Sequence, residues 1–119
     1  PTRDFNFVKD TCRGFLTLGT AQGIEGRDIN IATGTEVTMK ETLETIARLM
    51  GEDVEYVVDP QRLRPAKSEV FRLCGDNTLI KSLTDWKPQY TLETGLKETI
   101  DWFTCKESLA RYKTDIYNR

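Results

Sequence analysis

The feature that most constrains this chain is a helix whose two ends are both marked in the sequence. Residues 38–41 read T-M-K-E, a capping box in which Thr38 accepts from the N3 amide and Glu41 reaches back to the cap. An apolar stripe at i, i+3, i+4 and i+7 follows, made of Leu43, Ile46, Ala47 and Met50. Gly51 is a C-cap candidate. We therefore expect a helix here, with one face buried.

Three further helices are predicted from apolar spacing. One covers residues 9–21, and a short one passes through residues 79–83. The last begins at Thr91 and runs at least to Cys105. Its expected buried face consists of Leu92, Leu96, Ile100, Trp102 and Phe103.

Short strands and one long loop complete the expected fold. The β-rich stretches are residues 4–8, 28–32, 36–37 and 54–58. Residues 59–68 are polar and contain Pro60 and Pro65, which predicts a loop. The expected fold class is α/β: one small mixed helix-strand lobe over residues 1–119, with few strands and long polar connections.

Charge and composition argue against several functional classes. The net charge is −2 and the pI is near 5.2, whereas nucleic-acid binders normally carry a basic surplus. No apolar run approaches the roughly 20 residues of a membrane helix. There is no histidine, which removes Ser-His and Cys-His catalysis and most zinc sites. We therefore expect no nucleic-acid or membrane partner, and no catalytic or metal site.

The cysteines indicate a reducing environment. Cys12, Cys74 and Cys105 are odd in number, lie far apart and form no C-x-x-C pair. A disulfide framework is not expected, and the cytoplasm is the expected location. Cys12 and Cys105 fall among apolar residues, so we expect them to be small buried thiols.

Taken in order, several motifs resemble those of the extended short-chain dehydrogenases/reductases. Residues 3–10 (RDFNFVKD) resemble an R-D-aromatic-x-x-V-x-D segment. Residues 29–34 (INIATG) are similar to an N-I-G-x-G strand and turn, with Ala32 where glycine is usual. The remaining matches are RPAKSEV at 64–70, GDN at 75–77, WKP at 86–88 and the helix at 92–103. Together these motifs cover nearly the whole chain.

The resemblance is nearest to nucleotide-sugar 4,6-dehydratases, and residues 111–118 are similar to the tail of UDP-N-acetylglucosamine 4,6-dehydratases. The family's glycine-rich dinucleotide loop and its Tyr-x-x-x-Lys pair have no counterpart here. The resemblance therefore implies a C-terminal substrate-binding region without its Rossmann domain. NAD would belong to the intact enzyme, and we expect this chain to bind no cofactor and to be inactive alone.

The resemblance also indicates which side chains contact substrate. Arg3 and Arg64 stand where the family places its diphosphate-contacting arginines, and a guanidinium suits that forked recognition. Glu69 is the expected acceptor for a base or ribose hydroxyl. The alternative for these residues is a solvated charge cluster on the surface.

Other functions fit the same sequence. The same region of a nucleotide-sugar 4-epimerase or decarboxylase of this superfamily would look much the same. The chain also fits a stand-alone module that binds a nucleotide-diphosphate sugar, for which a UDP-sugar is favoured. The last alternative is an interaction domain whose exposed face, normally covered by the Rossmann domain, makes a homodimer.

Overall fold

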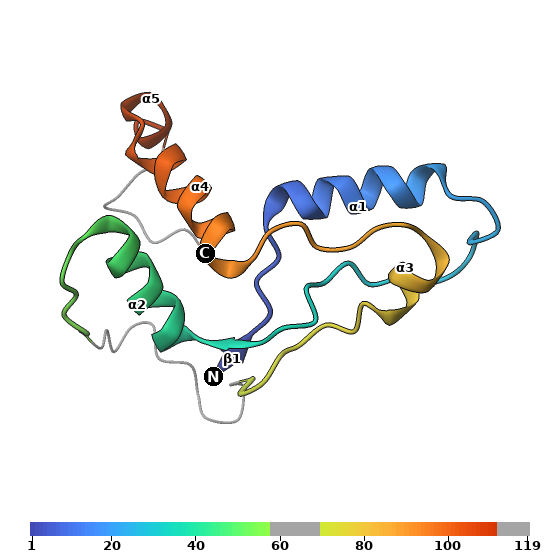
Figure 1. Cartoon of the computed structure of the whole chain (residues 1–119), viewed down its shortest axis with the longest axis horizontal. Helices are drawn as coiled ribbons and strands as arrows, with labels where there is room; N and C mark the ends of the chain where they lie inside the picture. Colours follow the sequence, from blue (N-terminus) through green and yellow to red (C-terminus); the bar gives the residue numbers. More distant parts are fainter. Residues whose placement is uncertain (58–69, 112–119) are drawn as a thin grey trace.

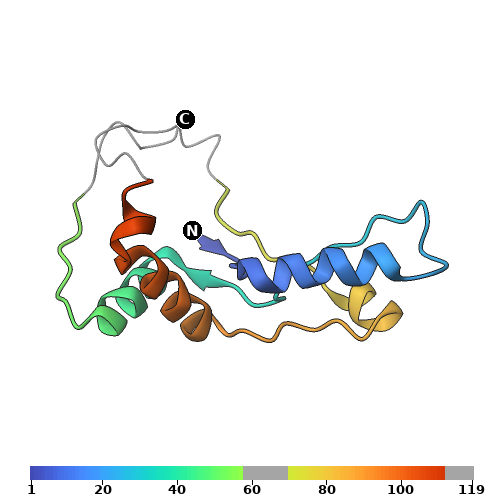
Figure 2. The same cartoon turned by 90° about the horizontal axis from the view of Figure 1, so that it is seen from above.

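The computed structural model describes residues 1–57 and 70–111. It contains helices α1 (Val8–Thr20), α2 (Met39–Met50), α3 (Thr78–Leu83), α4 (Leu92–Thr104) and α5 (Lys106–Leu109). Two short strands, β1 (Thr2–Arg3) and β2 (Val37–Thr38), pair antiparallel. Helices α1 and α3 occupy one half of the molecule, and α2, α4 and α5 occupy the other (Figures 1 and 2). The predicted mixed helix-strand composition is confirmed.

The capping signals read from the sequence form as expected. The Thr38 hydroxyl accepts from the Glu41 amide at 3.0 Å, and the Glu41 carboxylate accepts from the Thr38 amide at 2.8 Å. Gly51 ends α2 in the left-handed region at φ 68°, a conformation that suits glycine. Thr91 and Thr94 cap α4 reciprocally. Local sequence thus fixes these boundaries.

The interior is small and partly polar. The buried apolar residues of the described chain are Ala32, Ala47, Ile80 and Trp86, and the buried polar ones are Asp10, Thr42 and Asn77. The Cα radius of gyration is 17.1 Å, against about 13 Å for a compact domain of this size. The fold is therefore open, and specific polar contacts must hold its halves in place.

Asp10 is the centre of the interior. It lies in the first turn of α1, where the helix dipole favours an acidic side chain, and it is fully buried. Its carboxylate accepts from the backbone amides of Gln89 and Tyr90 at 3.1 Å and from the Arg13 guanidinium. The Trp86 indole donates to the Asp10 carbonyl at 3.1 Å. One residue therefore ties α1 to the segment that leads into α4.

Arg13 completes this cluster. Its guanidinium donates to the Lys87 carbonyl at 2.7 Å and lies 5.6 Å from the centre of the Trp86 ring. The charge on Asp10 is thus paired and hydrogen-bonded, which is what burial of a carboxylate requires. Trp86 is 2% exposed, so its ring is part of the core.

Three of the predicted strands do not form. Residues 4–7 are irregular, because the Asp4 side chain bonds a distant turn and α1 already starts at Val8. Residues 28–32 and 54–57 have no strand beside them in the described chain, so they carry no ladder of hydrogen bonds. The brief strand predicted at residues 36–37 is found as β2, one residue later.

Several predicted core residues are exposed. Trp102 and Phe103 are 43% and 39% exposed, and they stack edge to face at 4.9 Å. Helix α4 makes its main contacts with α2 and α5, so the rest of its surface stays open. Cys12 and Cys105, expected to be buried, are exposed thiols as well. Apolar neighbours in sequence did not imply apolar neighbours in space.

Asp10→Ala tests whether this carboxylate organises the fold. The substitution leaves Arg13 and the Gln89 and Tyr90 amides without their acceptor, and we expect it to lower the free energy of unfolding by about 3 kcal/mol. Urea denaturation followed by circular dichroism measures the change. Asp101→Ala, at an exposed position of α4, is the control and should change stability by less than about 0.5 kcal/mol. Equal effects would contradict a central role for Asp10.

Candidate substrate-binding site

Arg3, one of the three predicted substrate contacts, lies in β1. One of its terminal nitrogens, Nη1, donates to the carbonyls of Thr2 and Val70, both at 2.7 Å. The side chain thus reaches a residue 67 positions away, immediately after the loop predicted to bind substrate. Arg64 and Glu69 lie outside the described residues, so their contact with substrate stays a prediction.

The segment that follows Glu69 runs beside β1. Thr2 donates its amide to the Phe71 carbonyl at 2.8 Å, and its carbonyl accepts from the Leu73 amide at 3.2 Å. These two bonds make a parallel bridge between Thr2 and Arg72. Because β2 pairs on the other edge of β1, three chain segments meet here. The structure therefore brings Arg3 close to the chain beyond the predicted loop.

The carboxylate of Glu36, the residue before β2, links the side chains of Thr2 and Arg72. The Arg72 Nε donates to both oxygens of Glu36 at 2.8 and 2.9 Å, and the Thr2 hydroxyl donates to Glu36 at 2.9 Å. Hydrogen bonds from Arg72 and then Thr2 hold the pKa of Glu36 below its usual range. No local sequence signal marks this pair, because its two charges lie 36 residues apart.

Asp4 joins three of the sequence motifs. Its carboxylate accepts from the Gly34 amide at 2.9 Å, and from the amides of Thr33 and Gly75 at 3.2 Å. The Thr33 hydroxyl donates to it too. The R-D, N-I-A-T-G and G-D-N motifs, at residues 3–4, 30–34 and 75–77, therefore meet around one side chain. Their order in the sequence suggested the family, but it gave no sign of this contact.

Asn77 and two glycines close the same junction. The Asn77 amide group donates to the carbonyls of Ala32 and Thr33 at 2.9 and 3.0 Å. Gly34 has a φ of 73°, as the predicted tight turn requires. Gly75 approaches so closely that a Cβ built on it would lie 2.3 Å from the Cβ of Ala32. Only glycine fits at that point without displacing the backbone.

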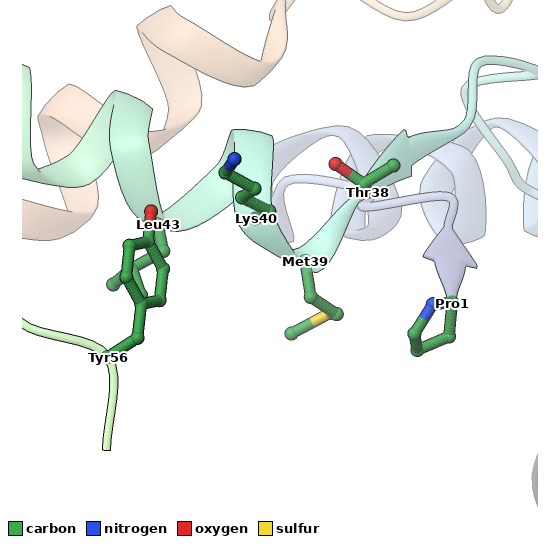
Figure 3. A pocket seen from close by; sticks show the side chains of 6 residues that line it. All are labelled: Pro1, Thr38, Met39, Lys40, Leu43 and Tyr56. Carbon is green, nitrogen blue, oxygen red and sulfur yellow. The ribbon is translucent and has the colours of Figure 1, made fainter. Parts of the chain in front are cut away.

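An open groove of about 470 Å³ lies next to β1 and β2 (Figure 3). It is lined by Pro1, Thr38, Met39, Lys40, Leu43 and Tyr56. Tyr56 and Leu43 lie toward one end of the groove and Pro1 toward the other, with Lys40 and Met39 between them. The walls are mostly apolar, and Lys40 supplies a cation. A groove with this lining suits an apolar or aromatic group.

The comparisons with known proteins agree with the motifs. The sequence model of the family described as GDP-mannose 4,6 dehydratase matches residues 1–99. The chain is 31% identical to the GDP-6-deoxy-D-mannose reductase of Pseudomonas aeruginosa over 102 residues, which are 85% of this chain and 33% of the reductase. It is 32% identical to the UDP-glucose 4-epimerase of Mycolicibacterium smegmatis over 105 residues, 88% of this chain and 32% of the epimerase.

A solved structure gives the same result for the fold. The dTDP-glucose 4,6-dehydratase of Bacillus anthracis, in complex with NAD, superposes with a TM-score of 0.73 at 32% identity. The match covers 89% of this chain and 32% of the dehydratase. The chain thus spans about a third of the length of the curated relatives it matches. In the described part of the chain, no helix is long and apolar enough to cross a membrane.

Gly75→Ala tests the close packing at the motif junction. The added methyl group must displace Ala32 or the Asp4 contact, so we expect the free energy of unfolding to fall by about 1–3 kcal/mol. Gly19→Ala, in α1, is the matched control. Beyond the backbone of α1 itself, no atom of the described chain lies within 4 Å of the methyl group that this substitution adds, and we expect stability to rise by about 0.5 kcal/mol. Chemical denaturation of both variants measures these changes. An unchanged free energy of unfolding in Gly75→Ala would contradict the packing argument.

The Glu36–Arg72 pair predicts a specific dependence on acid. The pKa of Glu36 is lowered on folding, so its contribution to stability is present above the ordinary carboxyl pKa of about 4.3 and is lost as the pH falls through the folded value. We expect Arg72→Met to raise the pKa of Glu36, measured by NMR titration of its side-chain carboxyl. Arg48→Met is the control: it removes a separate pair with Glu93 and should leave the pKa of Glu36 unchanged. An unaltered Glu36 pKa in Arg72→Met would refute the assignment.

Proposed function

The chain belongs to the GDP-mannose 4,6 dehydratase family, and from this we propose that it is the nucleotide-diphosphate-sugar-binding part of an NAD-dependent nucleotide-sugar 4,6-dehydratase. Its motifs are those of the extended short-chain dehydrogenases/reductases, as the resemblance predicted. The observation that carries the proposal is the position of Arg3. It is anchored to Val70 at 2.7 Å, next to the segment that contains Arg64 and Glu69.

The chemistry of the substrate supports this assignment. A nucleotide sugar carries a pyrophosphate, which a planar guanidinium recognises through paired hydrogen bonds. In our proposal Arg3 and Arg64 bind this group and Glu69 accepts from a ribose or base hydroxyl. The apolar groove beside β1, with Lys40 in its wall, is available for another part of the same ligand.

The reaction itself requires groups that these 119 residues lack. A Tyr-x-x-x-Lys pair and a glycine-rich dinucleotide loop are missing from the sequence. We propose that a Rossmann domain outside residues 1–119 supplies them and holds NAD. The NAD-bound dehydratase of Bacillus anthracis, 32% identical over the matched part, supports NAD as the cofactor of the intact enzyme. The chain alone would then bind substrate without converting it.

A second candidate is the same region of a nucleotide-sugar 4-epimerase. The 32% identity to the Mycolicibacterium smegmatis epimerase favours it as much as the solved dehydratase favours the first candidate. A decarboxylase or a stand-alone binding module would present the same arginines. In each case we propose a cytoplasmic protein, because three widely spaced cysteines of odd number suit a reducing compartment.

Calorimetric titration tests the binding proposal directly. The chain is titrated at low salt with UDP and with UDP-N-acetylglucosamine, and GDP reports on the preference for the base. We expect saturable binding that Arg64→Ala weakens about tenfold or more, the usual loss of a charge-assisted contact. Arg27→Ala, exposed in the loop after α1, is the control and should bind as the parent chain does.

The outcomes separate two parts of the proposal. Binding that Arg64→Ala leaves unchanged would contradict the arginine assignment while retaining a ligand site in this chain. No saturable binding by the parent chain would contradict the proposal that residues 1–119 bind substrate by themselves.

A further inference from the structure

The Glu36 carboxylate ties together the two chain segments that hold Arg3. Its Oε2 accepts from the Thr2 hydroxyl and from the Arg72 Nε, both at 2.9 Å, and its Oε1 accepts from the same Nε at 2.8 Å. Thr2 is the residue before Arg3 in β1. Arg72 lies two positions after Val70, whose carbonyl accepts from Arg3. One side chain therefore bridges both sides of the Arg3 environment.

The orientation of the Arg3 guanidinium depends on the same two segments. Its Nη1 donates to the carbonyls of Thr2 and Val70, both at 2.7 Å. A guanidinium is planar, and each of its terminal nitrogens carries two hydrogens. Two acceptors at Nη1 therefore fix both the position and the plane of the group. A shift of one segment against the other would break one of these bonds.

The backbone alone holds the two segments together weakly. Strand β1 has two residues, and in the described chain Thr2 makes its backbone bonds to residues 70–73 through the Phe71 carbonyl and the Leu73 amide. A strand this short makes too few ladder bonds to hold a register firmly. Glu36 stands directly before β2, where the three segments meet beside β1 (Figure 1). Its side chain adds contacts to both segments at this point.

We propose that Glu36 is a positioning residue for Arg3. Its carboxylate holds in place the two segments whose carbonyls orient the Arg3 guanidinium. The ligand of Arg3, the diphosphate of a nucleotide sugar, rests on the function proposed above. Glu36 does not touch this ligand. Its effect on binding passes through Arg3, because a forked contact with a diphosphate depends on the plane of the guanidinium.

The negative charge of Glu36 separates positioning from a simple effect of surface charge. A carboxylate repels a nearby diphosphate, so on electrostatic grounds alone its removal tightens the binding of an anion. Removal also frees the Arg72 guanidinium from its carboxylate partner, which acts in the same direction. Positioning predicts the opposite sign, since Arg3 loses its fixed orientation. The direction of the change in affinity therefore distinguishes the two effects.

Calorimetric titration with UDP measures this direction. Methionine keeps the length of the side chain but offers no oxygen acceptor, and we expect Glu36→Met to raise the Kd for UDP about fivefold or more. Glu93→Met is the matched control, because it removes the carboxylate of another arginine pair, with Arg48. It should leave the Kd unchanged, and circular dichroism checks that both variants keep their helices. Unchanged or tighter binding by Glu36→Met would overturn the proposal.

A double substitution tests whether the effect passes through Arg3. Arg3→Lys keeps the positive charge but lacks the planar fork, so the orientation set by Glu36 no longer matters to the ligand. In an Arg3→Lys chain, Glu36→Met should therefore cause no further loss of UDP affinity. A loss as large as in the parent chain would show that Glu36 acts on binding by another route, and would refute the positioning role.

The Arg3 side chain also reports on its own positioning without any ligand. Two hydrogen bonds at Nη1 slow rotation about the Cζ–Nη1 bond, so NMR should resolve the Arg3 guanidinium signals, assigned by their loss in Arg3→Lys. We expect Glu36→Met to average these signals and Glu93→Met to leave them resolved. If the parent chain binds no UDP, the proposed function fails and this measurement alone decides the positioning role. Unchanged Arg3 signals in Glu36→Met would overturn that role in either case.

Discussion

The buried carboxylate of Asp10 is the contact on which the arrangement of the helices depends. It accepts from Gln89, Tyr90 and Arg13, while the carbonyl of the same residue accepts from Trp86. A buried charge is costly unless it is paired and hydrogen-bonded, so α1 and the segment before α4 fit together in few ways. The apolar interior of this chain is small, so packing alone does not fix the relative positions of its helices. A directional contact of this kind does.

A second carboxylate plays the same part at the other end of the 4–10 segment. Asp4 collects the amides of Thr33, Gly34 and Gly75, and Arg3, its neighbour, reaches Val70. Two adjacent residues with opposite charges therefore build this junction. Asp4 organises the turns, and Arg3 donates to the Val70 carbonyl next to the predicted loop. This division explains why the family motifs are short and scattered: each supplies one backbone group or one small residue to a shared junction.

The open shape of the molecule follows from its small apolar interior and its reliance on polar contacts. Helices α2 and α4 pack on each other, and α1 and α3 flank residues 28–31, but the two halves share only β1, β2 and the segments around them (Figures 1 and 2). Apolar side chains on α1 and at the end of α4 remain exposed, and within the described chain the backbone of residues 28–31 makes no hydrogen bonds. Exposed apolar side chains and unpaired backbone groups are the surfaces that another part of a protein usually covers.

The sequence by itself determined helices α1 to α4, the caps of α2 and α4, and the family, but not the break at Cys105, where α4 was expected to continue. A capping box, an i, i+3, i+4 stripe and a terminal glycine act within a few residues, so α2 and α4 are capped where predicted, by Thr38 and Thr91. The family motifs are also short stretches of local sequence, and Arg3, Arg64 and Glu69, the predicted substrate contacts, lie within them. Tertiary structure alone decided which β-rich stretches became strands, that Trp102 and Phe103 stay exposed, and that Asp4, Asp10 and Glu36 hold the junctions together. These outcomes depend on groups that are far apart in the chain: a strand needs a neighbour, burial needs a facing surface, and a carboxylate needs its donors in place.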